Sequence, residues 1–118
     1  MTLANKPKLY LAMYKFIKYL YTLVHNFPKE YKYSLGENIL QSGWETLDDI
    51  VFANNLPNTK KKPYIKRACG NFERLILKLH MAFKLKLFSP KQMEFIILHE
   101  VEIEKMLKGW YKWANQKY

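Results

Sequence analysis

Apolar residues recur every three or four positions along four long segments of the chain. This spacing places them on one face of an α-helix, and no segment alternates apolar and polar residues for long enough to predict a strand. Prolines stand at the segment boundaries, where they suit the first turn of a helix. The pattern predicts helices over about residues 7–25, 28–54, 63–87 and 90–115.

The boundary before the fourth segment carries a clear helix start signal. Ser89 is followed by Pro90 and, three residues after the serine, by Gln92. A serine side chain in this place accepts a hydrogen bond from the third helical residue, and the glutamine side chain bonds back to the serine backbone. We therefore expect the helix to begin at Pro90 with a capping box.

Short connections join the four segments, so each helix should pack beside the next in the opposite direction. A helix of about 24 residues is about 36 Å long at 1.5 Å per residue, which is enough for a complete bundle. The predicted fold class is all-α, an antiparallel up-down-up-down four-helix bundle made by one domain over residues 1–118. Gly36 and Gly43 lie inside the second predicted helix, where we expect a neighbouring helix to approach closely.

The composition is typical of a folded, soluble protein, because 49% of the residues are hydrophobic and 16% are aromatic. Cys69 is the only cysteine in the sequence, so an internal disulfide is excluded and a reducing compartment is favoured. Lys15 and Lys18 interrupt the apolar N-terminal stretch, which argues against a signal peptide and against a membrane span. We expect a cytoplasmic protein that does not insert into membranes.

Charge is distributed unevenly along the chain. The net charge is +10, from 20 basic and 10 acidic residues. Residues 60–88 hold nine basic residues and one acidic residue, whereas residues 29–59 hold two basic and five acidic ones. A strongly basic segment of this kind attracts polyanions, and nucleic acid is the first candidate.

The basic segment includes the start of the third predicted helix. On a helix that begins near Pro63, the side chains of Arg67, Arg74 and Lys78 fall at i, i+7 and i+11 and form one stripe. The candidate nucleic-acid-binding residues are Lys60, Lys61, Lys62, Lys66, Arg67, Arg74 and Lys78. Each phosphate that they neutralise would release counterions, so we expect salt-sensitive binding to the backbone of RNA or DNA. The alternative is an ordinary solvated helix face.

The sequence gives little support for catalysis or for a metal site. His80 and His99 could come level on neighbouring helices, with glutamates nearby. The di-iron pattern of helix bundles requires glutamate three residues before each histidine, and these positions hold Leu77 and Ile96. We therefore expect no metal, no cofactor and no enzymatic activity.

Tyrosine and tryptophan are more numerous in the two terminal segments than one small core can accommodate. These side chains suit half-exposed surfaces and subunit contacts. The surplus predicts a homo-oligomer.

The segment FPKEYKYSLGENI, from Phe27 to Ile39, resembles the accessory variability determinant (Avd) family of diversity-generating retroelements. It is also similar to the small four-helix proteins encoded within intervening sequences of bacterial ribosomal RNA genes. The shared features are the proline that opens the second helix, the run Lys32-Tyr33-Ser34-Leu35-Gly36, the four helices and a basic third helix.

The resemblance to Avd proteins implies a non-catalytic four-helix bundle that assembles into a basic pentameric barrel. It implies that the chain binds a reverse transcriptase and nucleic acid, and that it supports the mutagenic copying of template RNA into cDNA. The seven candidate basic residues would then contact RNA, DNA or the polymerase–RNA complex. Two alternatives stay open: a protein of the ribosomal intervening-sequence type, and a structural homo-oligomer without a nucleic-acid role.

Overall fold

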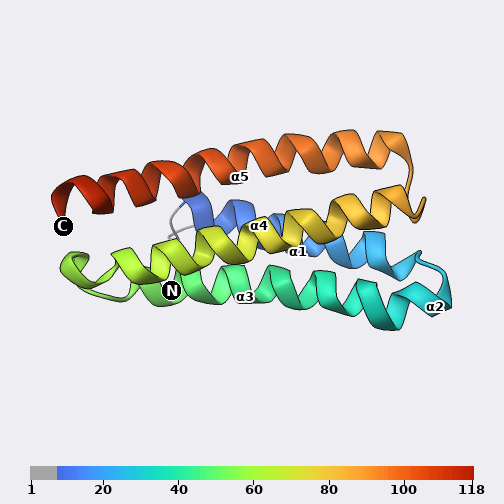
Figure 1. The fold of residues 1–118 in the computed structure, drawn as a ribbon, viewed down its shortest axis with the longest axis horizontal. Helices are drawn as coiled ribbons and strands as arrows, with labels where there is room; N and C mark the ends of the chain where they lie inside the picture. Colours follow the sequence, from blue (N-terminus) through green and yellow to red (C-terminus); the bar gives the residue numbers. More distant parts are fainter. Residues whose placement is uncertain (1–7) are drawn as a thin grey trace.

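The computed structural model describes residues 8–118, and every regular element within that range is helical (Figure 1). The elements are α1 (Lys8–His25), α2 (Lys29–Tyr31), the π-helical turn η2 (Lys32–Gly36), α3 (Glu37–Asn54), the 3-10 turn η3 (Asn58–Lys60), α4 (Lys62–Lys84) and α5 (Pro90–Lys117). Because α2, η2 and α3 follow one another without a break, the described chain forms four long helical segments. The predicted all-α class with four helices is confirmed. The predicted helix start at Pro7 lies outside the described residues.

The helices begin and end for identifiable local reasons. The Ser89 hydroxyl accepts a hydrogen bond from the Gln92 backbone at 3.1 Å, and the Gln92 side chain accepts one from the Ser89 backbone at 2.8 Å. This confirms the capping box at the start of α5. The third predicted helix was expected to reach residue 87, but α4 ends at Lys84 because Lys86 adopts a left-handed conformation with φ 62°. The Leu87 amide then donates to the Ala82 carbonyl at 3.0 Å, which closes the helix end.

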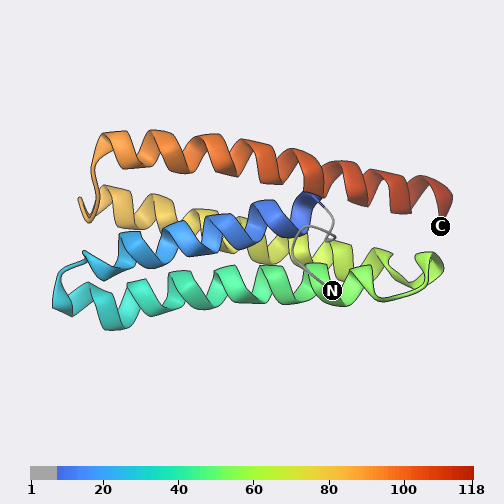
Figure 2. The ribbon, with the colours of Figure 1, turned by 180° about the vertical axis from the view of Figure 1, so that it is seen from behind.

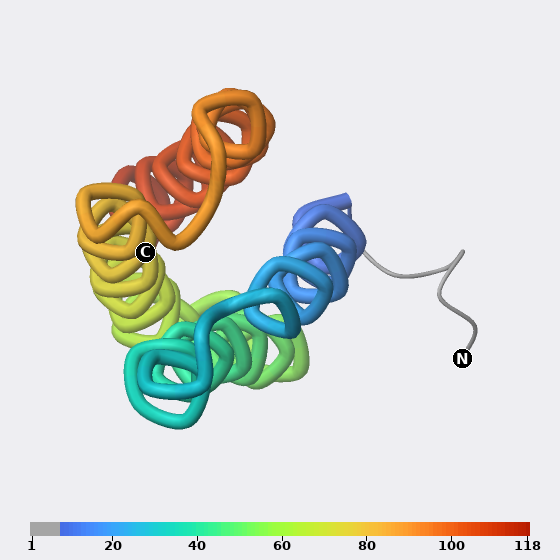
Figure 3. Tube along the Cα trace, turned by 90° about the vertical axis from the view of Figure 1, so that its right-hand side faces the viewer, coloured from blue at the N-terminus to red at the C-terminus, as the bar shows by residue number. Residues whose placement is uncertain are grey.

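The four segments run lengthwise beside one another, with α1 and α4 pointing one way and α3 and α5 the other (Figures 1 and 2). Seen from the end, α3 lies between α1 and α4, and α5 lies beyond α4 (Figure 3). The most extensive contact between helices joins α3 and α4, and the contact between α1 and α5 is much smaller. Aromatic rings bridge this last pair, since the Tyr19 and Phe95 centroids are 4.5 Å apart.

The core fills the space between the helices with side chains from every long segment. Phe16 of α1 is completely buried, and its ring centroid lies 6.3 Å from that of Phe72 in α4 and 5.9 Å from that of His99 in α5. Other large apolar side chains that are fully buried include Met13, Leu20, Ile39, Ile50, Ile65, Leu75, Leu79, Ile96, Ile103 and Leu107. The spacing that predicted the helices therefore also identified most of the core.

Two glycines allow α1 and the second helical segment to approach each other. A Cβ atom added to Gly36 would lie 2.7 Å from the Val24 Cγ1 atom, and one added to Gly43 would lie 3.2 Å from the Ile17 Cγ1 atom. The expected close approach at both positions is confirmed. Gly36 is the last residue of the π-helical turn η2, so the end of this turn packs closely against α1.

Within residues 8–118, no helix combines the length and the apolar character that crossing a lipid bilayer requires.

Candidate nucleic-acid interface

The first half of α4 and the facing side of α3 form an open groove of about 750 Å³, which we call the α3–α4 groove. Its lining consists of Glu45, Asp48, Asp49, Pro63, Lys66, Arg67, Gly70, Asn71 and Arg74. Lys66, Arg67 and Arg74 are exposed, and all three are candidate residues that the sequence predicted. The groove therefore brings three of the seven candidate residues together.

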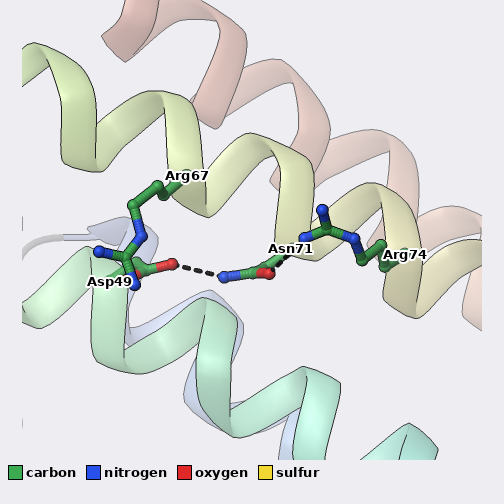
Figure 4. A network of polar contacts seen from close by, with 4 residues as sticks. All are labelled: Asp49, Arg67, Asn71 and Arg74. Carbon is green, nitrogen blue, oxygen red and sulfur yellow. Dashed lines mark hydrogen bonds and ion pairs between the residues drawn. The ribbon is translucent and has the colours of Figure 1, made fainter.

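One buried carboxylate links the two arginines of the α3–α4 groove (Figure 4). Asp49 of α3 is only 7% exposed, and its Oδ2 atom accepts a hydrogen bond from the Asn71 side-chain amide at 2.6 Å. The Asn71 carbonyl oxygen in turn accepts a hydrogen bond from Arg74 Nη1 at 2.8 Å. On the other side, Arg67 Nη2 lies 3.7 Å from Asp49 Oδ1. The two arginines are seven residues apart, about 10 Å along the helix axis, and both contact the same polar network.

The groove is mixed in charge, because α3 contributes the acids and α4 contributes the bases. Glu45, Asp48 and Asp49 line it together with Lys66, Arg67 and Arg74. The arginines nevertheless extend into solvent, since the side chain of Arg67 is 66% exposed despite its contact with Asp49. The acidic character of residues 29–59 is visible in the sequence, but its position beside the basic residues of α4 depends on how α3 packs against α4.

Two of the seven candidate residues direct their charges into the bundle instead of outward. Lys61 is only 8% exposed, and its ammonium group donates to the Ala53 carbonyl at 2.7 Å and the Asn54 carbonyl at 3.1 Å. It thereby satisfies carbonyl groups at the C-terminal end of α3. Burial lowers the pKa of this ammonium group from its ordinary value. The expectation that Lys61 faces outward with the other cations is wrong.

Lys78 lies further along the same stripe and is half-buried. Its ammonium group donates to the Ser42 hydroxyl of α3 at 2.6 Å, so it serves the contact between the two helices. Five candidates remain at the surface, with Lys62 partly covered and the others exposed: Lys60, Lys62, Lys66, Arg67 and Arg74. We call these five residues the basic surface.

An aromatic pair continues the line of the α3–α4 groove. Phe52 of α3 is 50% exposed, and its ring centroid lies 4.7 Å from that of Tyr64 in α4. The Arg67 guanidinium carbon lies 5.9 Å from the centroid of the Tyr64 ring, within the range of a cation–π contact. The sequence pattern does not predict this pair, because the proximity of the two rings depends on how α3 packs against α4.

Of the groups considered for metal binding, His80 and Glu100 meet at the seam between α4 and α5, whereas His99 packs toward α1. His80 Nε2 lies 3.6 Å from Glu100 Oε2, whereas the His99 ring packs against Phe95 with centroids 4.4 Å apart. Among residues 8–118, no three His, Cys, Asp or Glu side chains are arranged to hold a metal ion. Cys69 is half-buried in this seam and lines a pocket of about 270 Å³, and burial raises the pKa of its thiol.

The second half of α4 and the first half of α5 expose aliphatic side chains, which we call the aliphatic patch. Its members are Leu77, Met81, Leu85, Ile97, Leu98 and Val101. The contact between His80 and Glu100 shows that these two stretches lie level with each other. Leu77 is 72% exposed and Leu98 is 70% exposed. An apolar surface of this kind is typical of a contact site.

The comparisons with known proteins give one match. The model of the bAvd-like family matches residues 7–114 of the chain. No curated protein and no solved structure matches the chain.

Proposed function

Because the chain belongs to the bAvd-like family, we propose that it is the accessory variability determinant of a diversity-generating retroelement. In this role it acts in the cytoplasm as a non-catalytic partner of the reverse transcriptase. It binds template RNA and the cDNA made from it, and it supports the mutagenic copying of one into the other. Each subunit is one domain, folded as an antiparallel up-down-up-down bundle.

The observation that carries the nucleic-acid part of this proposal is the basic surface on α4 and the turn before it. Arg67 contacts Asp49, Arg74 contacts Asn71, and Lys66 lies on the same exposed stretch of helix. Arginines that already contact the protein lose less side-chain freedom when they neutralise phosphates. The contacts are with the backbone and are independent of sequence.

The proposal includes a homo-oligomer, and the Avd resemblance gives a pentamer as its expected form. The aliphatic patch supports self-association, because large exposed apolar areas usually mark contact sites. A second surface with exposed aromatic rings lies at the junction of α1 and α3, where Tyr21 is 48% and Trp44 is 40% exposed and the Trp44 ring nitrogen donates to the Tyr21 hydroxyl at 2.9 Å. Two different apolar surfaces suit the head-to-tail contacts from which rings are built.

The proposal is tested by supplying the purified chain to the reverse transcriptase and template RNA of its own retroelement. We expect cDNA to accumulate only when the chain is present. We also expect direct RNA binding that weakens by roughly 100-fold between about 50 and 200 mM salt, the loss calculated for about five single-strand phosphate contacts. Binding that is weak and insensitive to salt, with cDNA synthesis unaffected by the chain, would instead favour a structural oligomer.

Two acidic residues of the α3–α4 groove should respond in opposite ways when their charge is removed. Glu45 is exposed and accepts a hydrogen bond from Gln41 at 3.0 Å, so Glu45→Gln only makes the groove more positive. Asp49 holds the arginines, so Asp49→Asn frees Arg67 although it also makes the groove more positive. We expect RNA binding to strengthen about twofold for Glu45→Gln and to weaken about threefold for Asp49→Asn, in line with the loss of part of one charged contact.

Fluorescence anisotropy with a labelled RNA at one salt concentration measures both variants. Thermal melts followed by circular dichroism verify that each variant is folded at the temperature of the binding assay. Stronger RNA binding by both variants would show that Asp49 only lowers the positive charge of the groove and does not position Arg67 for binding.

A further inference from the structure

The aromatic pair at the end of the α3–α4 groove is poorly explained by packing alone. Phe52 lies in the last turn of α3, and half of the surface of this large apolar side chain is exposed to solvent. Its ring is tilted by 55° to that of Tyr64, and Tyr64 is itself half-buried. The pair therefore presents an aromatic surface that nothing in the described chain covers completely.

Basic residues lie close to this aromatic surface along the chain, and one of them contacts it. The Arg67 guanidinium group contacts the Tyr64 ring, and the same residue reaches Asp49 in the α3–α4 groove. Lys60 and Lys62 flank Lys61, whose ammonium group binds the carbonyls of the two residues that follow Phe52. A polyanion bound by Arg67 in the α3–α4 groove is thus brought next to the aromatic pair.

We infer that Phe52 and Tyr64 form a stacking platform for an unpaired nucleobase, so that the basic surface prefers single-stranded nucleic acid to a duplex. A basic groove that tracks the backbone, combined with exposed aromatic rings, is the combination by which proteins hold single strands without reading their sequence. In a duplex the bases are stacked on one another and cannot reach the platform. This inference rests on the proposed function and specifies the form of nucleic acid that the site takes.

The platform also accounts for the position of Arg67. Its guanidinium group lies between the carboxylate of Asp49 and the ring of Tyr64, so it joins the groove to the platform. A phosphate on Arg67 places the neighbouring base within reach of the aromatic pair. Backbone binding and base stacking would then occur on one continuous strand.

Phe52→Ala tests the platform with two probes, a single-stranded RNA oligonucleotide and an RNA duplex of the same length, at equal salt. We expect affinity for the single strand to fall about tenfold, the effect of losing one stacked base. Affinity for the duplex should stay within about twofold, and the salt dependence should be unchanged because no charge is altered. Phe52→Leu keeps the apolar bulk and lacks the ring, so it should behave as Phe52→Ala does.

Phe95→Ala is the matched control, because Phe95 is 43% exposed on α5 and packs on Tyr19 away from the groove. Neither probe should distinguish this variant from the parent. Equal effects of Phe52→Ala on both probes, or no effect on either, would overturn the inference. So would a smaller oligomer in light scattering, which would identify Phe52 as a subunit contact.

The two proposals can fail separately. If reversing the charges of the basic surface leaves RNA binding unchanged, the proposed function itself is wrong. If that reversal abolishes binding while Phe52→Ala and Phe52→Leu bind single strands normally, only the stacking platform is wrong.

Discussion

Replacing Lys66, Arg67 and Arg74 together by glutamate should weaken RNA binding at about 50 mM salt by a factor on the order of 100 or more. Each of these side chains is exposed and lines the α3–α4 groove, so each can neutralise a phosphate. Their loss removes about three counterion-releasing contacts, and the new carboxylates repel the backbone. Electrophoretic mobility shifts or anisotropy with a labelled RNA measure the change, and cDNA synthesis should fall with it.

The control for this variant carries the same change in net charge on another helix. Lys8, Lys15 and Lys18 of α1 are all exposed, and their replacement by glutamate lowers the net charge by the same amount. If only the overall field matters, the two triple variants will bind RNA equally poorly. If the face of α4 is the binding surface, the α1 variant should keep an affinity within about tenfold of the parent.

Replacing Lys61 by methionine should lower the free energy of unfolding by about 2 kcal/mol without a comparable loss of RNA binding. The ammonium group of Lys61 is buried and donates to two carbonyls at the end of α3, and methionine leaves both carbonyls without that donor. Chemical denaturation followed by circular dichroism measures the stability.

The neighbouring residue provides the matched variant. Lys60→Met alters an exposed side chain, so we expect a stability change of less than about 0.5 kcal/mol and a measurable loss of RNA affinity. The two substitutions remove the same charge from adjacent positions. A stable Lys61→Met variant that binds RNA worse than Lys60→Met would contradict the structural role of Lys61.

The helices could be predicted from the sequence because their signals are local. Apolar spacing, prolines and the Ser89–Gln92 pair act within a few residues, and the observed elements follow them closely. The end of α4 was predicted too late in the sequence because Lys86 adopts a left-handed conformation that is common for glycine and unusual for lysine.

The spacing of apolar residues does not show how much of each side chain stays exposed to solvent. Trp44 and Val101 follow the helical pattern, yet they are 40% and 60% exposed.

The candidate site was only partly accessible from the sequence, because its geometry depends on contacts between helices. The stripe of Arg67 and Arg74 followed from positions along one helix. Lys61 donates to a carbonyl at the end of α3, and Lys78 donates to the Ser42 hydroxyl. Neither hydrogen bond can be predicted without knowing how α3 lies against α4. The same is true of Asp49, whose carboxylate joins the two arginines from the opposite side of the groove.

The salt dependence of RNA binding, measured in parallel for the parent and for the Lys66, Arg67 and Arg74 charge-reversal variant, tests the central claim most directly. The account predicts a steep line for the parent in a plot of log affinity against log salt concentration. It predicts a slope shallower by about 2 for the variant, because about three single-strand phosphate contacts are lost. Parallel lines for the two proteins would contradict the assignment of nucleic-acid binding to α4.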